Sequence, residues 1–273
     1  MKTGCLTSRP KQLVLYEALG LPPPQYAHIP LIVGADRARL SKRTGATAVA
    51  DYRQVGYLPD AFVNYLALLG WSPGGNRELI SRQELVELFD ISRVRKTAAQ
   101  FDQQKLDWLN SQHVKHMPVD RLTELIAERL IAKGVLPASY DRAWLSRIAA
   151  LLQDRIKVLE ELEEEHGFFF QETPAYQPEA VEQFLAADGV AEQLLALKDR
   201  LQPLPSFETS SVEQATRAFI AERGLAPKAL IHPIRVAVTG RAVSPPLFEV
   251  MSIVGKEKVL SRLEHAATQL AKH

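Results

Sequence analysis

The stretch that says most about this chain is Asp36-Arg37-Ala38-Arg39-Leu40-Ser41-Lys42-Arg43-Thr44-Gly45-Ala46. Its central pentamer, Arg39 to Arg43, holds three cations and one hydroxyl, and Gly45 follows where the chain can bend. A loop of this composition can lie over a triphosphate and neutralise the charge on a departing pyrophosphate. Because surface loops often carry two or three basic residues, the pattern becomes specific only through the segments around it.

Short segments on both sides of this loop occur in a defined order. They are, along the chain, Pro10-Lys11-Gln12-Leu13-Val14-Leu15-Tyr16-Glu17-Ala18-Leu19-Gly20, Ala27-His28-Ile29-Pro30-Leu31-Ile32, Gly56-Tyr57-Leu58-Pro59-Asp60-Ala61, Asn64-Tyr65-Leu66-Ala67-Leu68-Leu69-Gly70-Trp71-Ser72, Lys105-Leu106-Asp107-Trp108-Leu109-Asn110 and Ile234-Arg235-Val236-Ala237-Val238-Thr239-Gly240. In this order and spacing they resemble bacterial-type glutamyl-tRNA synthetase, from about Pro10 to Leu263. The pentamer Arg39-Leu40-Ser41-Lys42-Arg43 resembles the second signature of class I aminoacyl-tRNA synthetases, the Lys-Met-Ser-Lys-Ser loop.

Part of the family pattern does not occur in this sequence. The first class I signature, a His-Ile-Gly-His-like element in a Gly-rich turn, has no counterpart, and the residues from Met1 to Arg9 do not match the family. The resemblance therefore implies a C-terminal portion that begins inside the catalytic domain and lacks most of the nucleotide-binding fold. For that reason we expect no aminoacylation by the isolated chain.

Length and composition set outer limits. A chain of 273 residues is long enough for two domains or three small ones, and 46% hydrophobic residues suffice for packed cores. We expect neither a membrane span nor an export signal, because apolar runs are short and the N-terminus has no basic-then-apolar pattern. One cysteine, Cys5, fits a reducing cytoplasm. A net charge of +1 argues neither for nor against RNA binding.

Hydrophobic periodicity and helix start and stop signals predict a mainly α protein. Helices are predicted over 11–20, 59–69, 82–89, 102–110, 119–133, 141–152, 153–166, 178–187, 190–201, 210–224 and 256–271, with short extended pieces over 28–33 and 236–239. Ser81 with Glu84, Asp141 and Ser210 are expected at helix starts, and Gly134, Gly167 and Gly224 at helix ends.

Prolines suggest where the domains divide, with a first boundary at Pro118 and a second at Pro203 and Pro205. Together with the resemblance, they predict a remnant of the class I catalytic domain and a stem-contact fold, followed by a helical anticodon-binding cage of two subdomains. The expected ranges are 1–35 for the end of the catalytic domain, 36–118 for the signature loop and stem-contact fold, and 119–203 and 204–273 for the two subdomains.

The resemblance assigns the basic loop to ATP. Lys42 is the expected catalytic residue, because its ammonium would meet the charge that develops on pyrophosphate. Arg39, Leu40, Ser41 and Arg43 are the expected ATP-binding neighbours, and Arg39 keeps the charge of the Lys that the signature usually has. Ser41 would either donate a hydrogen bond to phosphate or shape the turn.

The resemblance also implies that Arg155 reads the third anticodon base. An arginine fork suits a base edge or a phosphate, and such reading would favour glutamate anticodons over glutamine ones. The alternative is a surface arginine paired with Glu160 on a charged helix. Without reading by Arg155, the enzyme would charge both tRNAs.

A second expected anticodon contact comprises Arg235, Ser244, Pro245 and Leu247, in the turn that follows Val236 to Thr239. A turn with free backbone groups, an apolar ledge and a nearby arginine suits splayed single-stranded bases. The alternative is that the valines form core and the prolines only end the extended piece.

Other features favour structural roles. Phe168-Phe169-Phe170 is expected to pack between helices, Trp71 and Trp108 are expected in the core, and the acidic run Glu160 to Glu165 is expected on a solvated face. The seven histidines show no paired spacing, so no protein-bound metal is expected.

The expected function is that of the C-terminal part of a glutamate–tRNA ligase, a monomer in the cytoplasm. It would recognise the stem and anticodon of tRNA-Glu and close a loop over ATP, whose Mg²⁺ belongs to the nucleotide; glutamate and ATP would be partners of the complete enzyme. The alternatives are a non-catalytic tRNA-binding module and a helical interaction protein that has lost RNA binding.

Overall fold

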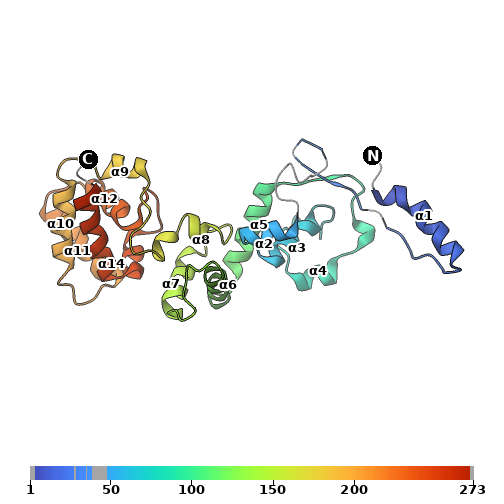
Figure 1. The fold of residues 1–273 in the computed structure, drawn as a ribbon, viewed down its shortest axis with the longest axis horizontal. Helices are drawn as coiled ribbons and strands as arrows, with labels where there is room; N and C mark the ends of the chain where they lie inside the picture. Colours follow the sequence, from blue (N-terminus) through green and yellow to red (C-terminus); the bar gives the residue numbers. More distant parts are fainter. Residues whose placement is uncertain (1–3, 28, 35, 39–47, 271–273) are drawn as a thin grey trace. The chain divides into compact units, whose positions relative to one another are not determined.

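The computed structural model describes residues 4–27, 29–34, 36–38 and 48–270. The chain is mainly α-helical, as predicted, and divides into two compact units (Figure 1). Unit 1 comprises the residues up to Met117 together with Ile156–Leu159. Unit 2 comprises Pro118–Arg155 and the residues from Glu160 onward.

Unit 1 contains helices and one very small sheet. Its elements are α1 (Gly4–Ala18), β1 (Ile32–Val33), α2 (Val49–Val55), α3 (Pro59–Leu68), α4 (Arg82–Leu88), the 3-10 helix η1 (Ile91–Arg93), β2 (Ala99–Gln100) and α5 (Gln103–His116). The two strands pair in parallel, with Ile32 opposite Ala99 and Val33 opposite Gln100. Parallel sheets normally have several strands with both faces covered, so this two-residue ladder is a minimal one.

The core of unit 1 lies between α2, α3 and α5. Buried Tyr52, Phe62 and Tyr65 pack with Leu106 and Leu109. The Tyr65 hydroxyl donates to the Asp102 carbonyl at 3.0 Å and accepts from the Asp102 amide at 2.7 Å, which fixes the start of α5. These contacts hold α3 and α5 together.

Two buried asparagines complete the backbone hydrogen bonding of unit 1. Asn64 accepts from the Ile80 amide and donates to the Glu78 carbonyl, both at 3.0 Å. Asn110 accepts from the Leu58 amide at 2.8 Å and donates to the Lys157 carbonyl. The second bond explains why Ile156–Leu159 belongs to unit 1 although it is distant in sequence.

Unit 2 is entirely helical in its described part. Its elements are α6 (Val119–Ala132), α7 (Arg142–Leu152), α8 (Glu161–Glu164), the 3-10 helix η2 (Gly167–Phe169), α9 (Pro178–Phe184), α10 (Val190–Leu201), α11 (Thr209–Glu222), α12 (Pro227–Thr239), α13 (Leu247–Val254), α14 (Lys256–His265) and the π-helical turn η3 (Ala266–Leu270). Helices α6 and α7 pack as a pair. Helices α12 and α14 pack together, and α10, α11 and α13 each pack against one or both of them. Trp144 and Arg147 of α7 link the groups by donating to the Ile253 carbonyl at 2.9 Å and to Ser252 Oγ at 2.8 Å.

A buried arginine joins three segments of unit 2. Arg262 of α14 is 1% exposed. Its guanidinium donates to the carbonyls of Glu172 at 2.9 Å, Val238 at 2.7 Å and Phe168 at 2.8 Å, and also to that of Gln171. Five donors in a planar fork suit such a cluster of backbone acceptors, which includes the C-terminal turn of α12.

Most predicted helix starts and ends are confirmed. Ser81 and Glu84 form the expected capping box, and Asp141 accepts from the Ala143 and Trp144 amides at the start of α7. The exception among the starts is Ser210, because α11 begins one residue earlier, after Glu208. Among the ends, Gly167 instead begins η2.

The predicted extended piece over 236–239 is wrong, because this segment is the last turn of α12. Val236 and Val238 favour a strand by propensity, but both are fully buried against the neighbouring helices. Gly240 then ends α12 at φ 75°, donating to the Val236 carbonyl at 2.7 Å. A Cβ at Gly240 would lie 2.2 Å from the Ala175 carbonyl oxygen, so this turn requires glycine.

Three other expectations differ from the structure. The predicted helix 153–166 is reduced to α8, because residues 153–160 form turns that allow Ile156–Leu159 to pack on unit 1. Trp108 is 44% exposed rather than in the core, whereas Trp71 is buried as expected. Helix α9 ends at Phe184, earlier than the predicted helix 178–187, and packs with α12.

Candidate functional site

The predicted ATP loop, Arg39, Leu40, Ser41, Lys42 and Arg43, lies outside the described residues. The segment that leads toward it is a tight turn. Arg37 donates from its amide to the Gly34 carbonyl at 3.0 Å, and Asp36 Oδ1 accepts from the Ala38 amide at 2.9 Å.

Arg155 lies in the exposed turn that follows α7. Its amide donates to the Leu152 carbonyl at 2.8 Å, which closes a turn directly after the end of α7. Within the part of the chain that the structure describes, its side chain forms no hydrogen bond or ion pair, and the pair with Glu160 considered above does not form. The guanidinium is therefore exposed and has all its donors available.

Arg235 and the turn at Ser244 lie together, as predicted. Nη1 of Arg235 donates to Ser244 Oγ and to the carbonyls of Ser244 at 3.2 Å and Pro245 at 3.1 Å. Burial lowers the pKa of the Arg235 guanidinium. The side chain therefore holds the turn in place with one of its nitrogens, and Pro245 and Leu247 are buried beneath the turn.

A further arginine, Arg241, belongs to this region and was not singled out from the sequence. It follows Gly240, and its Nη2 donates to the carbonyl of Glu164, the last residue of α8. The only sequence signal was its position directly after the Val-Thr-Gly segment quoted above. Its contact with residue 164 could not be predicted, because it joins segments that are far apart in the sequence and depends on tertiary packing.

The charges of Arg241 and Arg155 both act on the imidazole of His166. This side chain is 8% exposed and packs edge-on against Phe168. Burial, and then the charges of Arg241 and Arg155, lower the pKa of His166 to about 4. The histidine is therefore neutral near pH 7 and adds no charge to those of the two guanidinium groups.

The expectation for the phenylalanine run is confirmed, since Phe168 and Phe169 are buried and their rings lie 4.5 Å apart. The acidic run is only partly solvated. Glu163 accepts from Arg129 at 2.8 Å and Lys133 at 2.9 Å, whereas Glu164 and Glu165 are exposed.

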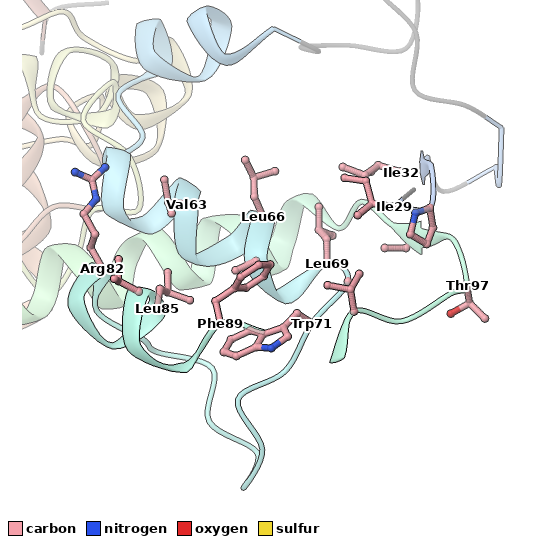
Figure 2. Close-up of a pocket in the computed structure, with 16 residues that line it drawn as sticks. Ile29, Ile32, Val63, Leu66, Leu69, Trp71, Arg82, Leu85, Phe89 and Thr97 are labelled. Atoms are coloured by element: carbon pink, nitrogen blue, oxygen red, sulfur yellow. The ribbon is translucent and has the colours of Figure 1, made fainter. Parts of the chain in front are cut away.

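Unit 1 carries an apolar groove of about 680 Å³. Figure 2 shows Val63, Leu66 and Leu69 along α3, Phe89 beside Trp71, and Ile29 and Ile32 on the segment that forms β1. Leu66 is 40% exposed and Phe89 48% exposed. Leu66 therefore lines an open apolar surface and is not packed into the core of unit 1.

Comparison with known proteins identifies both units. The family model for the anticodon binding domain matches residues 121–267, more than half of the chain. This chain belongs to the anticodon-binding domain family. The model for the catalytic domain of class I tRNA synthetases, E and Q, matches residues 3–108.

Relatives of this anticodon-binding protein are glutamate–tRNA ligases. Those of Moorella thermoacetica and Dehalococcoides mccartyi (strain 195) are 40% and 41% identical, over 96% and 97% of this chain and 54% and 56% of their own length. The crystal structure of a glutamate tRNA ligase from Elizabethkingia meningosepticum, in complex with its amino acid, has a TM-score of 0.79 at 27% identity, covering 97% of this chain and 56% of that one. This chain corresponds to their C-terminal portion and spans about half their length.

The described residues contain no helix long and apolar enough to span a membrane. Nor do the described His, Cys, Asp and Glu side chains include a group of three that could hold a metal ion.

Proposed function

We propose that this chain supplies the tRNA-recognising part of a glutamate–tRNA ligase and the loop that closes over ATP. The observation that carries the proposal is Arg155, an exposed arginine on an anticodon-binding domain whose side chain has no partner among the described residues. Its fork can donate to a base edge or a phosphate without breaking an existing contact. The turn at Ser244, Pro245 and Leu247, which Arg235 holds in place, would form a second contact with the anticodon loop.

The complete enzyme would join glutamate to tRNA-Glu in two steps. A glutamate carboxylate oxygen attacks the α-phosphorus of ATP and pyrophosphate leaves; a ribose hydroxyl of the tRNA 3′ end then attacks the activated carbonyl and AMP leaves. Lys42, with Arg39, Ser41 and Arg43, would neutralise the charge on pyrophosphate. This assignment rests on the sequence, and the Mg²⁺ that accompanies ATP is assigned to no residue of this chain.

Unit 1 would need the other half of the catalytic domain in order to act. The parallel ladder of unit 1 and its open apolar groove are adjacent in space, since Ile32 and Ala99 pair in the ladder and also line the groove. Both features lie within the residues that match the catalytic-domain model. Further strands and helices would extend the ladder and cover the groove. We therefore assign the groove to the N-terminal half of a class I catalytic domain, and we expect the chain alone to be inactive.

Binding of the chain to a tRNA-Glu transcript over a salt series tests the recognition, beside a transcript with an altered third anticodon base. Tighter binding to the correct anticodon, lost in Arg155→Gln, is the expected result. Equal and steeply salt-dependent binding to both would mean phosphate contact without readout. Absence of binding to either transcript would contradict the proposal.

A charging assay tests the requirement for the other half. The chain alone should not charge tRNA-Glu, and addition of the N-terminal half of the Moorella relative should restore measurable charging. A Leu66→Lys variant should prevent the restoration, because it places a charge in the groove, while Leu195→Lys on unit 2 should not. Charging by the chain alone would overturn this part of the proposal.

Three further points stay predictions of the same proposal: the boundary at Pro118 between the stem-contact and anticodon-binding parts, the cytoplasmic location and the monomeric state. Within unit 2 we assign α9 and α10 to the same functional group as α11 to α14, because they pack together.

A further inference from the structure

Two arginines from separate parts of unit 2 act electrostatically on one buried histidine, His166. Arg241 follows α12 and reaches the Glu164 carbonyl, two residues before His166. Arg155 follows α7, and its charge acts on the same imidazole. Nδ1 of His166 is buried and, among the described residues, has no hydrogen-bond partner. The charges of two guanidinium groups thus act on a polar ring that neutralises neither.

Many other cations of unit 2 are neutralised by carboxylates. Examples are Arg129 with Glu163 at 2.8 Å, Arg200 with Glu222 at 2.8 Å and Lys198 with Glu264 at 3.1 Å. Arg241 instead donates to a backbone carbonyl, and Arg155 has no carboxylate partner in the described residues. The exposed side chains of Glu164 and Glu165 form no ion pair within that described part either. Both positive charges are therefore available to an anion from outside.

We propose that Arg241 and Arg155 together form a binding site for RNA, in which Arg241 binds a backbone phosphate while Arg155 reads a base. This inference rests on the proposed function. Two guanidinium groups that both act on one imidazole also repel each other, and an anion bound by both removes that repulsion. The hydrogen bond from Arg241 to Glu164 commits one nitrogen and fixes the side chain, which leaves its other donors for phosphate oxygens.

The choice of a phosphate for Arg241 has a geometric reason. Its guanidinium is anchored to the backbone on one side, so it cannot adjust freely to the edge of one particular base. A phosphate accepts from many directions and repeats along the strand, so an anchored cation can bind it whatever the base. Arg155 is unanchored and exposed, which suits a fork that must match a base edge.

Three variants test the proposal. Arg241→Gln removes the charge but keeps an amide that can donate to Glu164, Arg241→Lys keeps the charge, and Arg200→Gln removes a cation that is already paired with Glu222. Each is measured for affinity to both transcripts over a salt series, and for its melting temperature. Arg241→Gln should weaken binding to both transcripts by about the same factor, roughly tenfold, and should reduce the slope of log affinity against log salt by about 0.7. Arg241→Lys should keep that slope, and Arg200→Gln should match the wild type.

The outcomes separate this inference from the proposed function. Unchanged affinity and slope in Arg241→Gln, with weaker binding in Arg155→Gln, would overturn the inference and leave the proposed function intact. A loss in Arg241→Gln confined to the correct anticodon would overturn the phosphate assignment. A lower melting temperature in both Arg241 variants, with equal loss of binding, would make Arg241 structural and overturn the inference too. Absence of binding by the wild-type chain would remove the proposed function itself, and the inference with it.

Discussion

Unit 2 buries its own apolar surface, whereas unit 1 leaves much of it open. In unit 2 the inward side chains of α7, α10, α12 and α13 are almost all buried, and many exposed cations have carboxylate partners. Most of the exposed large hydrophobic side chains in the described residues belong to unit 1, and several of them line the groove beside β1. Unit 2 therefore covers its own apolar surfaces, whereas unit 1 leaves an apolar face that further secondary structure would have to cover.

This difference separates two kinds of function. A surface for RNA can be built on a closed helical unit, because single-stranded bases and phosphates need only exposed donors and shaped turns. A catalytic site of the class I type needs parallel strands and their covering helices, and unit 1 has a parallel ladder of two residues per strand. The predictions that follow test how independent and how complete each unit is.

The largest effect on stability is expected for Arg262→Ala in unit 2. The change would remove the donor from four carbonyls, of which those of Val238 and Phe168 lie in buried hydrogen bonds, and the cost should be about 4 kcal/mol in the free energy of unfolding. Urea denaturation measures it, with Arg200→Ala as the control that should change stability by less than about 0.5 kcal/mol. If the units are independent, only the transition of unit 2 should move. Equal shifts in both transitions would break the comparison.

The next effect concerns the turn after α12. Gly240→Ala should destabilise unit 2 by about 3 kcal/mol, because the new Cβ would meet the Ala175 carbonyl oxygen at 2.2 Å and φ is 75°. Gly224 is the matched control, since its φ is 64° but nothing lies within 4 Å of the added Cβ. Gly224→Ala should cost about 1 kcal/mol. Similar losses of unfolding free energy at the two positions would mean that the backbone near Gly240 shifts and relieves the steric clash.

The stability of unit 2 should also depend on pH through His166. Its folded pKa is about 4, below the ordinary value of 6.5, so the unfolded state binds the proton first as pH falls. Burial of the neutral imidazole contributes its full stabilisation above pH 6.5. This contribution is lost as the pH falls from 6.5 to 4, and His166 causes no further loss of stability below pH 4. The loss should reach up to about 3 kcal/mol. Urea midpoints at pH 7, 5.5 and 4.5 measure it, and His166→Gln should remove this part of the dependence, which Arg155 and Arg241 strengthen in the wild type.

Local sequence signals predicted the helices well where side chains act on their own backbone. Ser81 with Glu84, Asp141 and Asp102 each accept from amides of the helix they precede, which depends only on neighbours in sequence. Failures came where tertiary packing decided the outcome. Val236 and Val238 are helical because they are buried among neighbouring helices. The charged segment after α7 forms turns where a helix was predicted, and Ile156–Leu159 within it belongs to unit 1.

The candidate site divides in the same way. The contact between Arg235 and the turn at Ser244 could be predicted because nine residues separate them in the chain. The contact between Arg241 and Glu164 spans 77 residues and depends on tertiary packing, which no spacing in the sequence reports. The open groove was missed because Leu66 and Leu69 look like core residues of an amphipathic helix, and periodicity cannot tell what covers an apolar face.

The smallest effect on stability is expected in the groove of unit 1, where Leu66→Asn should change the free energy of unfolding by less than about 0.5 kcal/mol. Leu66 is 40% exposed, so most of its apolar surface gains nothing from folding of this chain alone. Leu106 is the matched control: it is fully buried in the same unit, and Leu106→Ala should cost about 2–5 kcal/mol. Once the N-terminal half is bound, Leu66→Asn should become costly as well, because the side chain would then be buried. A large cost at Leu66 in the isolated chain would show that unit 1 already covers its own groove, and the contrast between the two units would no longer hold.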